Sequence, residues 1–121
     1  MPRYTFVVLT NPVEGLEDEF NDWYTSKHLD DVLKLEGFVS AQRFRFVSKD
    51  PEQAPSHKYM ALYDVETDDL WATHQKLVDV ARTDAMPFSP GIDDSTIVGW
   101  YYEPITEIVT QESRQLSESR S

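Results

Sequence analysis

The sequence predicts an α+β domain whose elements follow the order βαββαβ. Strand-like stretches begin near residues 4, 38, 58 and 96, two stretches with helical spacing lie between them, and Pro or Gly punctuates the connections. This order is the ferredoxin-like, or split-βαβ, arrangement of an antiparallel sheet and two helices. We expect one domain over residues 1–104 and a polar C-terminal tail over residues 105–121, dispensable for stability beyond about Gln115.

The first strand is predicted over residues 4–10, YTFVVLT, because β-branched and aromatic residues favour strands. Asn11 and Pro12 end it, since proline cannot donate to a ladder of hydrogen bonds. An amphipathic helix is predicted over about residues 15–27, with charged residues on its outer face. Its inner face consists of Leu16, Phe20, Trp23, Tyr24 and Lys27.

A second short helical turn is predicted over residues 28–35, before Gly37, which suits a left-handed helix terminator. His28 therefore falls where we expect the first helix to end. Because it follows Tyr24 by four residues, it returns to nearly the same side of the helix and inherits the inward direction.

The second strand is predicted over residues 38–47, FVSAQRFRFV, which alternate. One face is expected to carry Val39, Ala41, Arg43 and Arg45, and the other Phe38, Ser40, Gln42, Phe44 and Phe46. A surface loop then precedes a third strand over residues 58–65.

The second helix is predicted from an N-cap at Thr67 to about Arg82. Its inner side is expected to consist of Leu70, Trp71, His74, Leu77, Val78 and Ala81. A loop broken by two prolines and Gly91 leads to a last strand over residues 96–102, which Pro104 stops.

Composition excludes several classes of function. The net charge of −11 repels phosphate backbones, so we expect no nucleic acid partner. The chain has no cysteine, and its three histidines lack metal-site spacing, so we expect no metal. Isolated glycines give no phosphate-binding loop, which argues against a nucleotide cofactor, and we expect no cofactor at all. No apolar run approaches a membrane span and the N-terminus reads as a strand, so we expect no membrane contact and a cytoplasmic protein.

The first and last strands are apolar or aromatic on both faces. An antiparallel sheet in water normally shows one polar face, and two helices cover only one. A second copy of the chain is the simplest cover for the other face, so we expect a homodimer packed sheet to sheet.

The stretch EFNDWYTSKHLDDVLKLEGFVSAQRF resembles the EthD-like branch of the dimeric α+β-barrel superfamily. The likeness rests on an acidic-Phe start, Trp-Tyr, a histidine four residues on, an apolar turn, Gly-Phe and an Arg-bearing strand. These positions are Glu19, Phe20, Trp23, Tyr24, His28, Leu29, Val32, Gly37, Phe38 and Arg43. Asp30 departs from the pattern, in which proline is common, and so does the long tail. The superfamily includes cyclases, isomerases and cofactor-free monooxygenases, so the fold does not choose a reaction.

The resemblance implies a pocket in each subunit, between sheet and helices, that His28 faces with Tyr24 one turn away. An imidazole can take and give protons near neutral pH without a cofactor. Two interpretations of His28 stay open: a proton-transfer group, or a structural histidine that bonds a backbone carbonyl and fixes the helix end. A ring nitrogen free in a cavity favours the first.

The other candidate residues are aromatic or cationic. A tyrosine on a strand can hold a carbonyl or enolate oxygen, and an arginine beneath a pocket can hold a carboxylate. Core packing and structural ion pairs are the competing interpretations. The candidate substrate-binding residues are Trp23, Arg43, Tyr59, Tyr63 and Trp100.

The sequence thus predicts a cofactor-free enzyme acting on a small hydrophobic carbonyl or phenolic compound, with His28 and Tyr24 as catalytic residues. Proton transfer would give an isomerase, cyclase or lyase. The alternatives are a non-catalytic protein that binds a small hydrophobic or aromatic metabolite and, less favoured, a cofactor-independent monooxygenase.

Overall fold

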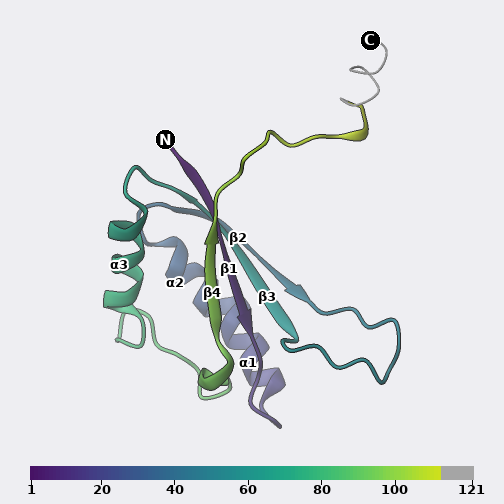
Figure 1. The fold of residues 1–121 in the computed structure, drawn as a ribbon. Coiled ribbons are helices and arrows are strands. Elements are labelled where there is room, and N and C mark those ends of the chain that lie inside the picture. The colour runs from purple at the N-terminus through teal and green to yellow at the C-terminus, as the bar shows by residue number, and fades with distance from the viewer. Residues whose placement is uncertain (113–121) are drawn as a thin grey trace.

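A single four-stranded antiparallel sheet forms the framework of the computed structural model, which describes residues 1–112 (Figure 1). The strands are β1 (Arg3–Thr10), β2 (Phe38–Arg45), β3 (Tyr59–Glu66) and β4 (Val98–Tyr102). They lie in the order β2-β3-β1-β4, so the first strand is central and pairs with β3 and β4. The βαββαβ order and the ferredoxin-like fold are confirmed. The part of the predicted tail beyond Gln115 lies outside the described residues.

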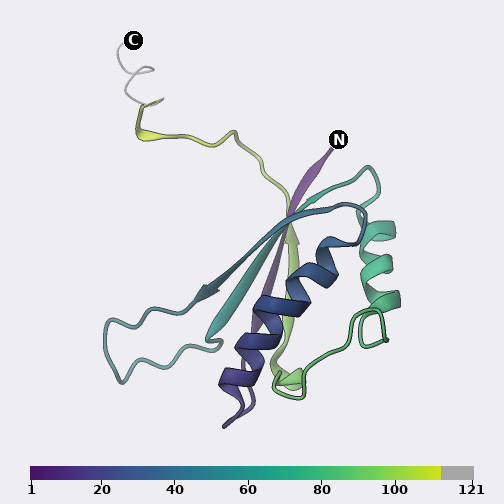
Figure 2. The same cartoon turned by 180° about the vertical axis from the view of Figure 1, so that it is seen from behind.

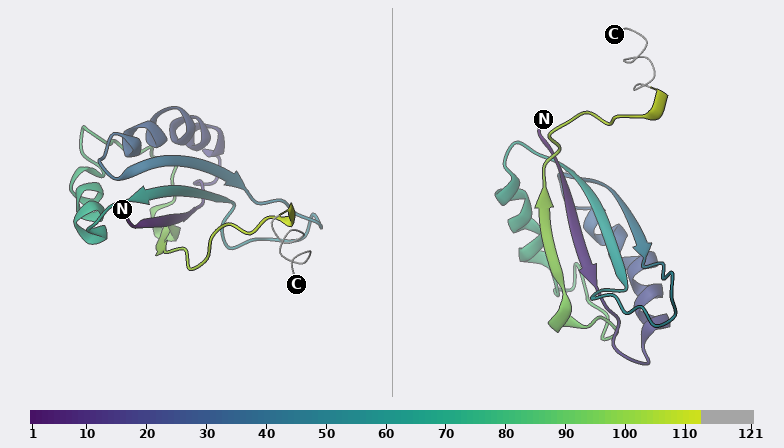
Figure 3. Two further views of the ribbon diagram at one scale, coloured as in Figure 1. Left: turned by 90° about the horizontal axis from the view of Figure 1, so that it is seen from above. Right: turned by 45° about the vertical axis from the view of Figure 1, so that its right-hand side comes forward.

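The helices cover one face of this sheet (Figures 1 and 2). They are α1 (Glu17–Trp23), a π-helical turn η1 (Tyr24–His28), α2 (Leu29–Leu33) and α3 (Leu70–Val80), and a short 3-10 turn η2 (Asp94–Thr96) precedes β4. Seen from above, α1 and α2 lie over the strands, and α3 lies at one side (Figure 3).

The first helix does not end at residue 27, so the prediction of a separate second helical turn after it is wrong. His28 has helical dihedral angles of −67° and −40°, and the chain continues from α1 through η1 into α2. Within η1 the amide of Leu29 donates to the carbonyl of Tyr24, five residues earlier. One extra residue is therefore accommodated as a π-turn, a feature frequent at functional sites.

A β-bulge corrects the predicted faces of β2. Phe38 pairs with Val65 and Ser40 with Asp64, so Val39 is the extra residue between them. The bulge turns the side chain of Phe38 into the core, where it is 4% exposed, and leaves Val39 52% exposed. Strict alternation predicts the opposite faces for these two residues.

The start of α3 also differs from the prediction. Asp69, not Thr67, is the N-cap, and its carboxylate accepts a hydrogen bond from the amide of Ala72. The helix register follows from this start. It buries Thr73 and leaves Trp71 67% exposed, although Trp71 was expected on the inner side.

The core lies between the sheet and the helices. Its buried residues are Phe6, Phe20, Tyr24, Val32, Phe38, Tyr59, Ala61, Tyr63, Val65, Met86 and Ile92. The opposite face, which we call the outer face, carries no helix among residues 1–112 (Figures 1 and 3). Its central row is Leu62, Val7 and Trp100, which are register partners across β3, β1 and β4.

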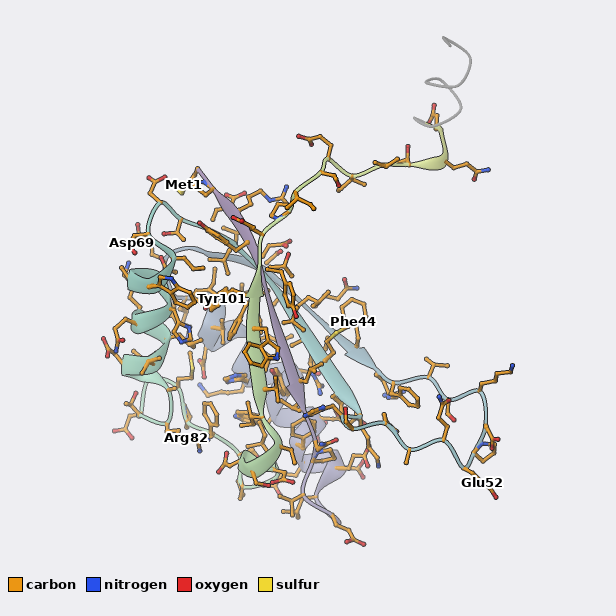
Figure 4. The ribbon with its side chains drawn as sticks, in the orientation of Figure 1. Met1, Phe44, Glu52, Asp69, Arg82 and Tyr101 are labelled. Atoms are coloured by element: carbon orange, nitrogen blue, oxygen red, sulfur yellow. The ribbon has the colours of Figure 1, made fainter. Side chains whose placement is uncertain are left out.

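Two segments project from this body. The loop between β2 and β3 extends away from the sheet, with Glu52 near its tip (Figure 4). After β4 the chain leaves the domain in an extended form, and Ile105 and Ile108 on it are 91% and 85% exposed (Figure 1).

Candidate functional site

A cavity of about 220 Å³ lies between the inner face of the sheet and the helices. The strands, the long first helix, α3 and the loop before β4 all contribute to it. Its lining residues are Phe6, Val8, Thr10, Tyr24, His28, Val32, Tyr63, Leu77, Val78, Ala81, Phe88, Ile92, Ile97 and Gly99.

Local periodicity places these side chains. Alternate residues of a strand share a face, so the inner residues of β1 reach the cavity while Val7 faces away. Tyr24, His28 and Val32 follow one another at intervals of four along the first helix and share one side of it. Gly99 leaves room for the ring of Phe6, which a β-carbon there would approach within 3.1 Å.

His28 is enclosed by aromatic rings and is 8% exposed. Its imidazole stacks on Trp23 at 4.7 Å between ring centroids, and it meets Tyr24 and Phe88 edge-on at 4.9 and 5.1 Å. Its Nδ1 atom is buried without a hydrogen-bond partner among residues 1–112. Nε2 makes no hydrogen bond there either but is not fully buried, and the residue lines the cavity.

This environment keeps His28 neutral. Burial lowers its pKa from 6.5 to about 4, and the nearby Arg43 also lowers it, while the charge of Asp31 acts in the opposite direction. At pH 7 the ring is therefore a neutral imidazole, and no backbone carbonyl of the described residues bonds it as a helix cap.

Two phenols lie beside it. The hydroxyl of Tyr63 donates to that of Tyr24 over 3.3 Å, and both residues line the cavity. Burial raises the pKa of both tyrosines, so both are neutral at pH 7. Since the Tyr24 oxygen accepts from Tyr63, its own proton is available to a group in the cavity.

The structure does not bring Arg43 to the cavity lining. Its guanidinium donates to Thr25 (2.9 Å) and to Asn21 (3.0 Å) and lies over the ring of Tyr24 at 4.5 Å. Arg43 thus ties β2 to the first helix behind Tyr24. The geometry supports the structural interpretation of this residue rather than a carboxylate clamp.

Three other candidates also lie away from the cavity lining. The hydroxyl of Tyr59 donates to Glu17 over 2.6 Å, and this bond lowers the pKa of Glu17. Trp100 is on the outer face and is 59% exposed. Trp23 stacks on His28 but lines a shallow neighbouring depression instead.

The loop between α3 and β4 contributes to the site, which the sequence pattern did not predict. Phe88 from this loop packs against both His28 and Trp23, and the indole Nε1 of Trp23 donates to the carbonyl of Pro87. Arg82 lies over the ring of Phe88 at 4.4 Å and pairs with Asp94 at 2.5 Å. The only signal in the sequence was an aromatic residue between two prolines.

The other histidines have protein partners. His74 Nδ1 lies 2.9 Å from the hydroxyl of Tyr101, between α3 and β4 (Figure 4). His57 Nε2 lies 2.7 Å from the carbonyl of Thr96. Residues 1–112 contain no group of three or more His, Asp and Glu side chains arranged to hold a metal. None of the helices in this part of the chain is long and apolar enough to cross a membrane.

Comparison with known proteins gives one family match and one curated relative. Residues 3–84 match the family described as "Domain of unknown function (DUF4286)". "Core atranone cluster (CAC) protein 1" of Stachybotrys chlorohalonatus (strain IBT 40285) is 35% identical over 96 residues, which is 76% of this chain. The chain spans about a third of the length of that relative, 33%.

Solved structures share the fold at low sequence identity. An EthD-like protein from Ralstonia eutropha JMP134 is 15% identical, with a TM-score of 0.57 over 89% of this chain and 96% of that chain. The heme-degrader MhuD from Mycobacterium tuberculosis, with two hemes in its active site, is 15% identical, with a TM-score of 0.57 over 88% of this chain and 99% of that chain. The chain therefore belongs to the DUF4286 family, a domain of unknown function, and it has the ferredoxin-like α+β fold of EthD-like proteins.

Proposed function

We propose that this protein is a cofactor-free enzyme that moves a proton on a small, uncharged carbonyl or phenolic compound bound in the cavity. The observation that carries the proposal is His28, a neutral imidazole that lines the cavity and makes no hydrogen bond among the described residues. A packed structural histidine normally satisfies its ring nitrogens, because an unpaired buried polar atom costs roughly 1–3 kcal/mol.

The cavity lining favours a ligand without charge. Among its described residues there is no Lys, Arg, Asp or Glu, and His28 is neutral. Arg43, the one candidate for binding a carboxylate, is held by Thr25 and Asn21. A carboxylate in this cavity would lose its hydration without gaining a cation, which is strongly unfavourable. Polar recognition is then limited to His28, Thr10 and the two phenols.

The chemistry that fits is abstraction of a proton from carbon next to a carbonyl. Nε2 takes the proton, the electron pair of the broken C–H bond moves into the C–C–O system, and an enolate oxygen forms. The Tyr24 hydroxyl donates to that oxygen. The proton then returns to another atom of the ligand, which is an isomerisation, or the carbanion attacks a second carbonyl or expels a group. The imidazolium and the enolate form together, so each stabilises the other in the apolar cavity.

Haem, which MhuD holds, does not fit this site. The cavity of about 220 Å³ is below the roughly 300–1,000 Å³ common for drug-sized ligands. Its lining also offers no cation to the two carboxylates that haem carries.

The proposal includes a homodimer formed through the outer face. The side chains of Trp100 and Tyr102 there are 59% and 58% exposed, and Val7, Leu9 and Leu62 lie beside them. Contiguous apolar surface of this kind is typical of a protein interface. The inner face carries the cavity, so this dimer leaves one site in each protomer.

The test is native mass spectrometry of the full chain with pairs of similar compounds, one uncharged and one anionic at pH 7. Each pair consists of the methyl ester of a small arylacetic acid, which has hydrogens on the carbon next to its carbonyl, and the free acid. We expect the neutral member to bind and the acid not to bind. Preferred binding of the acids would overturn the assignment of an uncharged ligand.

Turnover is tested on the neutral compounds that bind, by proton exchange with deuterated water at the carbon next to the carbonyl. We expect exchange with the parent protein and none with His28→Gln, whose dimer and melting temperature stay close to those of the parent. If the parent protein and His28→Gln bind the compound equally and neither exchanges the proton, the protein is a non-catalytic binding protein. Oxygen consumption in the same assay would identify an oxygenase.

A further inference from the structure

Phe88 forms a wall between two hollows of the molecule. It lines the cavity that His28 lines, and it also lines the shallow depression between the first helix and the loop before β4. This wall touches the candidate base, because the rings of Phe88 and His28 meet edge-on with 5.1 Å between their centroids. The position of the Phe88 ring therefore decides whether the imidazole meets an apolar wall or an opening on this side of the cavity.

Two prolines limit the backbone hydrogen bonds of the loop around Phe88. Pro87 and Pro90 have no amide proton, so they cannot donate to another part of the backbone. Side-chain contacts hold this part of the loop. The indole Nε1 of Trp23 donates to the carbonyl of Pro87 over 3.1 Å. The guanidinium of Arg82 lies over the Phe88 ring, with its central carbon 4.4 Å from the ring centroid.

Arg82 is itself held by a carboxylate at the far end of the loop. It follows α3 directly (Figure 4), and its guanidinium pairs with Asp94 of η2. Nη2 lies 2.5 Å from Oδ1, and Nη1 lies 3.4 Å from Oδ2. Two bonds of this kind fix the orientation of a planar guanidinium, and a cation in this position is attracted to the face of an aromatic ring. Asp94, Arg82 and Phe88 thus form one chain of contacts that ends at His28.

The backbone at residue 82 does not account for an arginine. Its φ angle is +70°, and Arg82 is the one non-glycine residue with a positive φ among residues 1–112. Glycine and asparagine adopt this conformation more readily than other residues do. What distinguishes arginine from asparagine here is the guanidinium, with its contacts to Phe88 and Asp94.

We propose that Arg82 is a positioning residue of the candidate site: anchored by Asp94, it holds the ring of Phe88 against His28 and keeps the wall between the cavity and the depression closed. Arg82 does not line the cavity, so it acts on a ligand only through Phe88 and His28. A closed wall excludes water from the imidazole and keeps it neutral. The effect on turnover rests on the proposed function, in which the neutral ring takes a proton.

The test is NMR of the full chain labelled in its histidine rings, at pH 8 and pH 5. The signals of His28 are assigned by their loss in His28→Gln. With a pKa of about 4, the parent ring is roughly one-tenth protonated at pH 5. Arg82→Asn suits the positive φ and removes the guanidinium, so water reaches the ring. We expect the His28 pKa to rise to about 5, which gives about half protonation at pH 5.

Asp94→Ala separates packing from charge. Loss of a nearby cation by itself raises the pKa of a histidine, and loss of a nearby anion by itself lowers it. If Arg82 acts through Phe88, removal of Asp94 frees the guanidinium, loosens the ring and also raises the His28 pKa. Shifts of opposite sign in Arg82→Asn and Asp94→Ala, or no shift in Arg82→Asn, would overturn the proposal.

Lys76→Gln is the matched control. It removes another exposed cation of the same region, which lies on α3 and pairs with Glu36 at 3.5 Å instead of with the loop. The His28 pKa should stay near 4 in this variant. A rise equal to that in Arg82→Asn would show a general effect of surface charge and would contradict a role for the Phe88 wall.

The position of the wall is measured directly by the nuclear Overhauser effect between the ring protons of Phe88 and His28 at pH 8. It should be strong in the parent and in the lysine variant, and weaker in Arg82→Asn. Asp31 and Arg43, whose charges also act on His28, are present in all these chains. No ligand is needed, so absence of proton exchange in the parent would remove the proposed function and leave this result standing. An undiminished effect in Arg82→Asn would overturn the positioning role.

Discussion

The imidazole of His28 lies nearly parallel to the indole of Trp23, with the ring centroids 4.7 Å apart and the planes at 28°. These residues are five positions apart. In a regular α-helix, about 3.6 residues per turn place such a pair roughly 140° apart around the axis. In the π-turn over Tyr24–His28 the amide of Leu29 donates to the carbonyl of Tyr24. The turn therefore contains one more residue than an α-helical turn, and this extra residue brings the two rings together. The stacking contact of the candidate base is thus a product of the backbone irregularity.

His28 makes stability depend on pH in the acid range. Its pKa in the folded chain is about 4, against 6.5 unperturbed, so the unfolded chain binds the proton first as pH falls. Stability is full above about pH 6.5 and is lost progressively down to about pH 4. A shift of this size corresponds to a loss on the order of 3 kcal/mol.

The measurement is urea unfolding at pH 7 and pH 4 for the parent and for His28→Gln. Both chains share every other titrating group, so the parent should lose more stability than the variant. An equal loss in the two chains would show that His28 is not buried as a neutral ring.

Tyr24→Phe tests the oxyanion donor. The substitution removes the hydroxyl that accepts from Tyr63 and donates into the cavity, so we expect roughly fivefold weaker binding of a neutral carbonyl ligand, about 1 kcal/mol. The control is Tyr59→Phe, whose hydroxyl bonds Glu17 away from the cavity lining. It should lower the melting temperature without changing ligand affinity, and a loss of affinity in both variants would argue against a specific role for Tyr24.

Phe88→Ala should open the cavity at its loop wall. Phe88 is partly buried and contacts His28, so the truncation removes an apolar wall and admits water to the ring. We expect a loss of about 2 kcal/mol in stability and a rise of the His28 pKa toward 6.5, because desolvation is relieved. Calorimetry and histidine NMR measure the two effects. Phe46→Ala, remote from the cavity lining, is the control, and a His28 pKa that stays near 4 in Phe88→Ala would contradict this role.

Trp100→Lys should convert the expected dimer to a monomer. The indole is on the outer face and 59% exposed, so a charge there costs nothing in a monomer but is buried unpaired in a sheet-to-sheet dimer. Trp71→Lys is the matched control, because Trp71 is similarly exposed, 67%, but lies on α3. Light scattering at micromolar concentration should give a dimer for the parent and for Trp71→Lys. A monomeric parent would end the proposal.

The fold was predictable because its signals are local. Alternation, helical spacing and breakers at Pro12 and Pro104 mark the strands and helices, and the order of elements then limits the topology. The direction of His28 was also predictable, since it depends only on the distance from Tyr24. The π-turn and the bulge at Val39 were not predictable. Each inserts a single extra residue, and tertiary packing decides whether such a residue is tolerated. A periodic sequence pattern carries no information about that packing.

The composition of the site was predictable only in part. Tyr63 lines the cavity because it lies on the inner face of the sheet, whereas Arg43 on β2 and Tyr59 on β3 share that face but meet the first helix instead. Which inner residue of a strand meets a helix and which meets open space depends on where the helix crosses the sheet. Phe88 lies in a loop, and the path of a loop cannot be predicted from a periodic sequence pattern.

The place of β4 in the sheet has a consequence for synthesis. β1 is made first, yet one of its two neighbours, β4, begins only at Val98. Until the ribosome has added that strand, β1 remains an edge with unpaired amides and carbonyls, and the cavity lacks its wall at Gly99. A nascent chain that stalls near residue 84, where the family match ends, has made both long helices but still exposes this edge. Such a chain is a template for pairing with its neighbours on a polysome, so β4 protects the first strand from aggregation.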